Sequence, residues 1–131
     1  MSSTEVFHNK FNNQRELTRT NYFHKTLPDA LKESDIFIYP SLHDGFGAPP
    51  QQAMACGCAL ATTRIPGTEE YGVHEENCMM STPNDVETMT NNVKRLIWNS
   101  ELRDKIRDNG LKTMKKFSRE ISTNQLIRFF E

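Results

Sequence analysis

Apolar and polar residues follow one another through the middle of the chain in blocks that predict two strands joined by a helix. An apolar run predicts a buried strand over residues 35–39, and a second uncharged run predicts another over residues 58–63. Residues 51–56 favour a short helix, and Gly57 can adopt the left-handed conformation that ends a helix. A strand, a helix and a strand linked this closely predict parallel pairing with a right-handed crossover.

The segments on either side of this unit predict further elements. Residues 7–20 are polar and have no clear period, which we interpret as a partial strand followed by a loop. Residues 21–23 predict a short strand, and residues 27–34 predict a short helix with Pro28 at its start. Residues 77–80 predict the last strand. A loop over residues 64–72 is expected to cross the carboxyl edge of the sheet, where ligands bind in open α/β folds.

The remainder of the chain predicts helices. Asp85 is expected to cap a helix whose apolar residues recur at spacings of three and four, namely Val86, Met89, Val93 and Leu96. Ser100 is expected to cap a second helix, and Gly110 either weakens its middle or ends it near Asn109. Ser118 is expected to cap a third helix with the apolar residues Ile121, Leu126, Phe129 and Phe130. Helices combined with parallel strands predict an α/β fold.

Size and composition are those of an ordinary globular domain. The chain has 131 residues, 36% of them hydrophobic, and a net charge of −1, which gives no overall attraction to nucleic acid. No apolar run approaches a membrane span, and the start of the sequence lacks a secretory pattern, so a cytoplasmic location is expected. Cys56, Cys58 and Cys78 are expected to be small buried side chains, because their number and spacing suit neither a disulfide framework nor a zinc site.

Basic residues gather toward the end of the sequence. Residues 94–131 contain ten Lys or Arg against five Asp or Glu, and Lys112, Lys115, Lys116 and Arg119 are close together. We interpret this stretch as a solvated helix face, because acidic residues are interspersed with the basic ones. Peripheral contact with anionic lipid is the alternative interpretation. No nucleic-acid-binding motif accompanies the basic residues.

A glycine-containing loop follows the first strand of the central unit. Gly45 and Gly47 carry no bulky side chain, and Pro49 and Pro50 fit the first turn of a helix. The backbone amides at such a helix start attract an anion. Short loops of this kind also occur between strands and helices that bind nothing, so the loop taken alone is weak evidence for a site.

The order of residues in this loop is more specific. The sequence Pro-Ser-Leu-His-Asp-Gly-Phe-Gly-Ala-Pro over residues 40–49, followed by Ala-Met-Ala-Cys-Gly-Cys, resembles the donor-sugar loop of retaining GT-B glycosyltransferases of family four. The resemblance continues through Thr62-Thr63 and residues 66–72 and covers residues 21–131, whereas residues 1–20 match nothing and stay unassigned. It implies a Rossmann-like three-layer sandwich with a mainly parallel sheet, which forms part of the C-terminal half of a GT-B fold.

The resemblance also implies a set of site residues. The family carries two glutamates separated by seven residues, the first near the donor sugar and the second on the ribose hydroxyls. This chain has Asp44 and Gln52 there, so Asp44 becomes the catalytic candidate and Gln52 a substrate-binding one. Glu70 matches a further family glutamate. The backbone that is expected to meet the diphosphate belongs to Gly45, Phe46, Gly47 and Ala48.

Each of these side chains also has a plainer interpretation. Asp44 can be a turn former, Gln52 an exposed helix residue and Glu70 an ordinary charged residue at a helix start. Aspartate is one methylene shorter than glutamate, and glutamine lacks the charge that strengthens a hydrogen bond to a diol. Donor binding should survive these replacements more easily than turnover. His43 precedes Asp44, and we interpret it as a solvated loop residue.

The implied activity is transfer of a sugar from a nucleoside diphosphate sugar with retention of configuration, without a metal or another cofactor. The implied partners are the sugar donor and an N-terminal acceptor-binding domain or a partner glycosyltransferase, and the isolated chain is expected to be inactive. A non-catalytic binding or assembly module is the alternative. Pairing of two copies through uncovered sheet edges is a further expectation.

Overall fold

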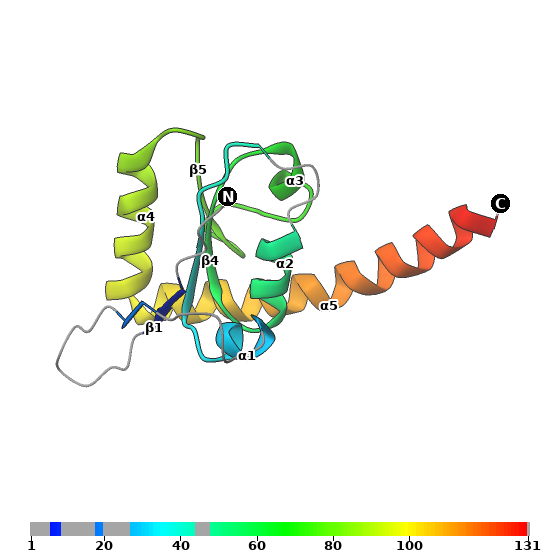
Figure 1. The fold of residues 1–131 in the computed structure, drawn as a ribbon, viewed down its shortest axis with the longest axis horizontal. Coiled ribbons are helices and arrows are strands. Elements are labelled where there is room, and N and C mark those ends of the chain that lie inside the picture. The colour runs from blue at the N-terminus through cyan, green and yellow to red at the C-terminus, as the bar shows by residue number, and fades with distance from the viewer. Residues whose placement is uncertain (1–5, 9–17, 20–26, 44–47, 131) are drawn as a thin grey trace.

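A five-stranded sheet forms the centre of the computed structural model, which describes residues 6–8, 18–19, 27–43 and 48–130 (Figure 1). The strands are β1 (Val6–His8), β2 (Thr18–Arg19), β3 (Ile36–Tyr39), β4 (Ala59–Thr63) and β5 (Met79–Ser81). They lie in the order β2-β1-β3-β4-β5. Strands β3, β4 and β5 are parallel, and β1 is antiparallel to both of its neighbours. The predicted parallel pairing of the central unit is therefore confirmed.

Helices cover both faces of this sheet. They are α1 (Leu27–Lys32), α2 (Ala48–Ala55), α3 (Pro66–Glu69), α4 (Val86–Trp98) and α5 (Ser100–Phe130). Figure 1 shows α4 on one side of the sheet and α1 and α2 on the other, while α5 runs across the end at which β4 begins. This is the expected α/β sandwich of three layers. The segment predicted as a strand over residues 21–23 lies outside the described residues.

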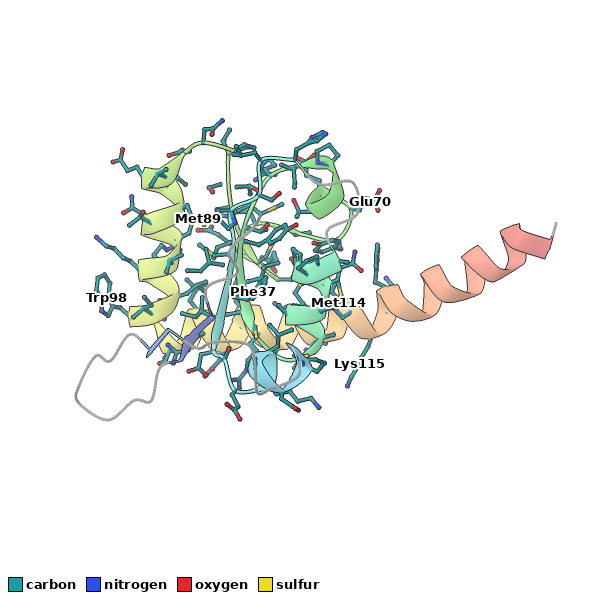
Figure 2. All side chains as sticks on the ribbon, in the orientation of Figure 1. Phe37, Glu70, Met89, Trp98, Met114 and Lys115 are labelled. Carbon is teal, nitrogen blue, oxygen red and sulfur yellow. The ribbon has the colours of Figure 1, made fainter. Side chains whose placement is uncertain are left out.

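Side chains alternate between the two faces along each strand and so build two apolar clusters. Phe37 and Leu60 are directed to the layer of α1 and α2, whereas Ile36 and Ala61 are directed to α4. The first cluster consists of Leu31, Phe37, Ala53, Met54, Cys58, Leu60, Tyr71, Cys78, Met80 and Met114. The second consists of Ile36, Ala59, Ala61, Met79, Met89, Leu96 and Ile106. Phe37, Met89 and Met114 are labelled in Figure 2.

Helix α5 is continuous from Ser100 to Phe130, whereas a separate helix was predicted to start at Ser118. Gly110 lies inside it, so of the two alternatives for this residue a position within the helix holds and an end near Asn109 does not. Ser118 also lies inside α5, so the expected cap at Ser118 is wrong. Gly110 is buried beside Met54 of α2, at a point where a Cβ atom would make only ordinary van der Waals contacts. The low helix propensity of glycine is therefore outweighed by packing. The apolar pattern predicted beyond Ser118 stays a prediction, because those side chains lie outside the described set.

The start of α5 also differs from the prediction. The side-chain oxygen of Asn99 accepts a hydrogen bond from the N–H of Leu102 at 3.0 Å, so Asn99, not Ser100, is the cap. The backbone N–H of Asn99 is donated to the carbonyl of Arg95 at 2.9 Å, so one residue closes α4 and opens α5. The predicted cap at Asp85 is confirmed, because its carboxylate accepts the N–H of Thr88 at 3.0 Å.

The buried face of α4 is rotated relative to the predicted stripe. Val86 is 75% exposed, whereas Met89, Asn92 and Leu96 are buried. Asn92 faces the sheet because its amide donates to the carbonyl of Met80 at 3.1 Å. Val86 stands about a quarter turn from the centre of that face, as 3.6 residues per turn require. The predicted stripe of apolar residues did not include Asn92, whose amide is buried by a hydrogen bond to a distant strand.

Within the described residues, no helix is both long enough and apolar enough to cross a lipid bilayer.

Candidate functional site

The carboxyl edge of the parallel strands is the part of the fold where a ligand would be expected. Strand β3 leads through Ser41 toward α2, and β4 leads through Arg64 into α3. Figure 1 shows α3 at the same end of the sheet as the beginning of α2. The predicted loop over residues 64–72 therefore contains a short helix, α3, and it does cross this edge of the sheet.

Two threonine hydroxyls join the ends of β3 and β4. The hydroxyl of Thr62 donates to the carbonyl of Tyr39 at 3.2 Å, and the hydroxyl of Thr63 donates to the carbonyl of Ser41. Both threonine side chains are almost completely buried. The second bond reaches beyond the last ladder pair of these strands, which is Tyr39 with Thr62. The backbone that leaves β3 is therefore fixed by a side chain of its neighbour.

A third threonine fixes the start of α3. The hydroxyl of Thr68 donates to the carbonyl of Thr63 at 2.6 Å and accepts the N–H of Ile65 at 3.2 Å. The N–H of Arg64 is donated to the carbonyl of Ser81 at 2.7 Å, so the same turn is also tied to the end of β5. These bonds satisfy polar groups that the end of a buried strand would otherwise leave unpaired.

The predicted site residues are only partly described. Asp44, Gly45, Phe46 and Gly47 lie outside the described residues, so their predicted roles rest on the sequence. Ala48 is exposed and begins α2, with Pro49 and Pro50 in the first helical turn as predicted. Proline has no backbone N–H, so this turn has fewer amide donors than an ordinary helix start. Of its first three residues, Ala48 is the one that has an N–H to give.

Gln52 and Glu70 are exposed and come from different elements. Gln52 lies one turn into α2, on the side of the helix away from buried Ala53 and Met54. Glu70 directly follows α3 with helical backbone angles. Figure 2 shows Glu70 at the surface beside α3, on the side of the sheet that carries α2. The structure thus places Ala48 and Glu70 at the same end of the sheet, and no contact between them is described.

The cysteines have structural environments. Cys58 donates its thiol hydrogen to the carbonyl of Leu31 at 3.0 Å. Burial raises the pKa of Cys58 to about 12 and that of Cys78 to about 12, which keeps both thiols protonated at neutral pH. Both are free and buried, as predicted, and Cys56 is half-buried. In the described parts of the chain, no three His, Cys, Asp or Glu side chains gather as metal ligands would.

One histidine and three lysines outside the predicted site were also located. His74 accepts the backbone N–H of Met80 at 2.9 Å, which makes it a structural residue. Lys112, Lys115 and Lys116 are exposed on α5, which crosses the opposite end of the sheet, and Figure 2 labels Lys115 there. Contact of these lysines with anionic lipid stays an untested alternative.

Sequence reasoning assigned no role to the threonines of this edge. Thr62 and Thr63 were noted only as part of a family pattern, and Thr68 was not singled out. The available signal was a pair of hydroxyl residues at the end of an otherwise apolar strand, where unpaired carbonyl groups are expected.

Comparison with known proteins identifies the family of the chain. Residues 8–113 match the family described as glycosyl transferases group 1. The O-antigen chain mannosyltransferase B of Escherichia coli is 29% identical over 105 residues, which are 80% of this chain and 27% of that protein. The chain therefore spans about a quarter of the length of this relative.

Solved structures agree with this match. The C-terminal domain of LpcC, a group 1 glycosyl transferase of Francisella tularensis, superposes with a TM-score of 0.66 at 27% identity, covering 74% of this chain and 51% of that one. HepE of Anabaena in complex with UDP has a TM-score of 0.62 at 18% identity, covering 74% and 30%. The fold is accordingly a Rossmann-like part of the C-terminal half of a GT-B fold. The chain belongs to the group 1 family of glycosyltransferases.

Proposed function

We propose that this chain is the donor-binding part of a glycosyltransferase that transfers a sugar from a nucleoside diphosphate sugar with retention of configuration. The observation that carries the proposal is the family match over residues 8–113, combined with a carboxyl edge built from β3, β4, α2 and α3. Among the structural neighbours, HepE was solved with UDP and with UDP-glucose. A nucleotide at this edge fits the general position of ligands in open α/β sheets.

The roles follow from the chemistry of the donor. Transfer breaks the bond between the anomeric carbon and the diphosphate oxygen, which leaves with the electron pair. The acceptor oxygen forms a bond to the anomeric carbon on the same face, and the proton of the acceptor hydroxyl passes to the departing diphosphate. The backbone amides of Gly45, Phe46, Gly47 and Ala48 are proposed to bind the diphosphate and disperse its growing charge. Asp44 is proposed to face the sugar.

Two polar side chains that the structure describes, Gln52 and Glu70, are proposed to bind the nucleoside part of the donor and its surroundings. Gln52 is proposed to accept a hydrogen bond from the ribose diol, and Glu70, directly after α3, to contact the donor. Both are exposed and therefore accessible to a ligand. Residues 21–131 form the proposed donor-binding unit, and residues 1–20 stay without a proposed function.

Turnover is proposed to need an acceptor-binding domain in addition to this unit. Asp44 is shorter than the glutamate of the family, and Gln52 is uncharged. A misplacement of about 1 Å at a reacting centre costs on the order of a hundredfold in rate. We therefore expect the 131-residue chain to bind donor with negligible transfer. The same two replacements favour the second candidate, a non-catalytic module that assists a catalytic relative.

Calorimetric titration of the chain with UDP, GDP and dTDP tests the proposal. A donor domain should bind one nucleotide more tightly than the other two, because part of the affinity comes from the base. Glu70→Gln should weaken that binding, whereas Glu69→Gln, which changes the charge one residue away, should leave it nearly unchanged. Equal absence of binding for all three nucleotides would contradict the donor-binding role and favour a pure assembly module.

Hydrolysis of nucleotide sugars distinguishes binding from turnover. The isolated chain should release nucleotide from UDP-glucose no faster than the uncatalysed background. A rate in the range of about 1–1,000 per second, typical of enzymes, would show that no further domain is needed.

A further inference from the structure

The carbonyl and hydroxyl of one residue, Thr63, hold both loops of the carboxyl edge. The hydroxyl donates to the carbonyl of Ser41 on the segment that leaves β3. The carbonyl accepts the hydroxyl of Thr68 at 2.6 Å in α3. Thr63 is 3% exposed and Thr68 is 0% exposed, so water does not replace either partner readily.

These two bonds connect the groups that the proposed function brings to the donor. Ser41 precedes the loop that leads to Ala48 and α2, and Thr68 lies two residues before Glu70. The ladder between β3 and β4 ends at Tyr39 with Thr62, so it does not fix Ser41 by itself. The relative position of the two loops therefore depends on the side chain of Thr63.

Resting on the proposed function, we infer that Thr63 is a positioning residue for donor binding, which fixes the segment after β3 against α3 so that both meet one nucleotide. It acts through Ser41 and Thr68 and does not touch the donor. A ligand that contacts both loops loses affinity when their separation is no longer fixed, because binding must then order them.

The matched variants are Thr63→Val, Thr63→Ser and Thr62→Val. Valine keeps the shape and the strand preference of threonine but removes the hydroxyl, and serine keeps the hydroxyl. Thr62 is the control because its buried hydroxyl also donates to a carbonyl, that of Tyr39, but within the ladder. Both valine variants lose one such bond and should therefore lose similar thermal stability.

Titration with the nucleotide that the wild-type chain binds then separates positioning from folding. Thr63→Val should lose on the order of tenfold in affinity, as the loss of one hydrogen bond to ordered backbone implies. Thr63→Ser should restore most of the affinity, and Thr62→Val should stay within about twofold of wild type. Equal affinity losses in the two valine variants, or none in Thr63→Val, would overturn the inference.

A measurement on the nucleotide-free chain tests the positioning role of Thr63 independently of whether the chain binds a donor. Backbone ¹⁵N order parameters of Leu42 and His43 should fall below the value of about 0.85 for rigid backbone in Thr63→Val and not in Thr62→Val. A wild-type chain that binds none of the three nucleotides would refute the donor-binding function, and a fall at Leu42 and His43 would still support the positioning of this segment. Unchanged order parameters in Thr63→Val would overturn the inference whatever the nucleotide result.

Discussion

Gly110 of α5 lies directly against Met54 of α2. A Cβ atom added at Gly110 would stand 3.5 Å from the Cε of Met54 and 3.6 Å from the carbonyl oxygen of Asn77, which are ordinary van der Waals distances. The crossing of α5 and α2 thus has room for one methyl group at position 110, where glycine has no side chain.

The first prediction is that Gly110→Ala stabilises the fold. Alanine is better than glycine inside a helix by about 1 kcal/mol, and no neighbour has to move. Urea unfolding should show a higher midpoint with an unchanged slope. Gly57→Ala is the contrasting variant, because Gly57 has φ of +86° and the same methyl there should cost about 1 kcal/mol. A less stable Gly110→Ala would mean that the helices are packed more closely than described.

The second prediction concerns Ser81, whose buried hydroxyl has no hydrogen-bond partner among the described residues. Ser81→Ala should leave the free energy of unfolding unchanged or raise it by up to about 1 kcal/mol, because the unpaired group is removed. Ser34→Ala is the matched control. Ser34 is equally buried but donates to the carbonyl of Ala30 at 2.7 Å, so its loss should destabilise the chain by about 1 kcal/mol. Equal losses in both variants would show that Ser81 has a partner.

The third prediction is that the stability contributed by Asp85, which caps the start of α4, is lost in acid. Hydrogen bonds from the hydroxyl and N–H of Thr88 hold the pKa of Asp85 below its ordinary value of 3.8. A carboxylate with a lowered pKa stabilises the folded state above its unfolded pKa, and that stabilisation is lost as pH falls through the lowered folded value. Asp85→Ala should therefore melt earlier than wild type at pH 7, and the difference should shrink below about pH 4. A difference that is constant with pH would contradict a charged cap.

The fourth prediction concerns alkaline conditions. Burial raises the pKa of Cys58 and Cys78 from 9.0 to about 12, so the folded state disfavours both thiolates. Unfolded cysteines lose their protons first, and stability should therefore decline as pH rises from about 9 toward 12. In the native chain, iodoacetamide at pH 8 should react with Cys56 in preference to the other two, and all three should react in guanidinium. Rapid native labelling of Cys58 or Cys78 would contradict their burial.

The fifth prediction tests the assignment of Gln52. Gln52→Glu should tighten binding of the preferred nucleotide severalfold, because a charged acceptor strengthens hydrogen bonds to the ribose diol by roughly a factor of two. Gln51→Glu adds the same charge at the neighbouring position and should not tighten it. An equal effect of both variants would indicate a long-range electrostatic effect of the added charge on nucleotide binding, and not a contact between residue 52 and the ribose.

Local sequence patterns predicted the central part of the fold well. The apolar runs of β3 and β4, the short helix between them and the positive φ of Gly57 follow from residue type and neighbouring positions, so they could be read without tertiary information. The resemblance to a glycosyltransferase family was also carried by a contiguous loop, and the family match supports it.

Features that depend on distant partners could not be predicted in this way. Gly110 lies inside α5 and is buried beside Met54 of another helix, and Asn92 is buried where its amide donates to the carbonyl of Met80. The bond from Thr63 to Ser41 joins residues that are far apart in the sequence, and it depends on the register of two strands. At the site, Ala48, Gln52 and Glu70 are now placed, whereas the roles of Asp44, Gly45, Phe46 and Gly47 still rest on the resemblance.

The passage of α5 from one face of the sheet to the other has a consequence for synthesis on the ribosome. Ile106 belongs to one apolar cluster and Met114 to the other, and both lie late in the chain. Each apolar cluster therefore lacks one of its buried side chains until these residues have emerged. Translation that halts before Ile106 should leave an aggregation-prone product in which neither half of the molecule is folded.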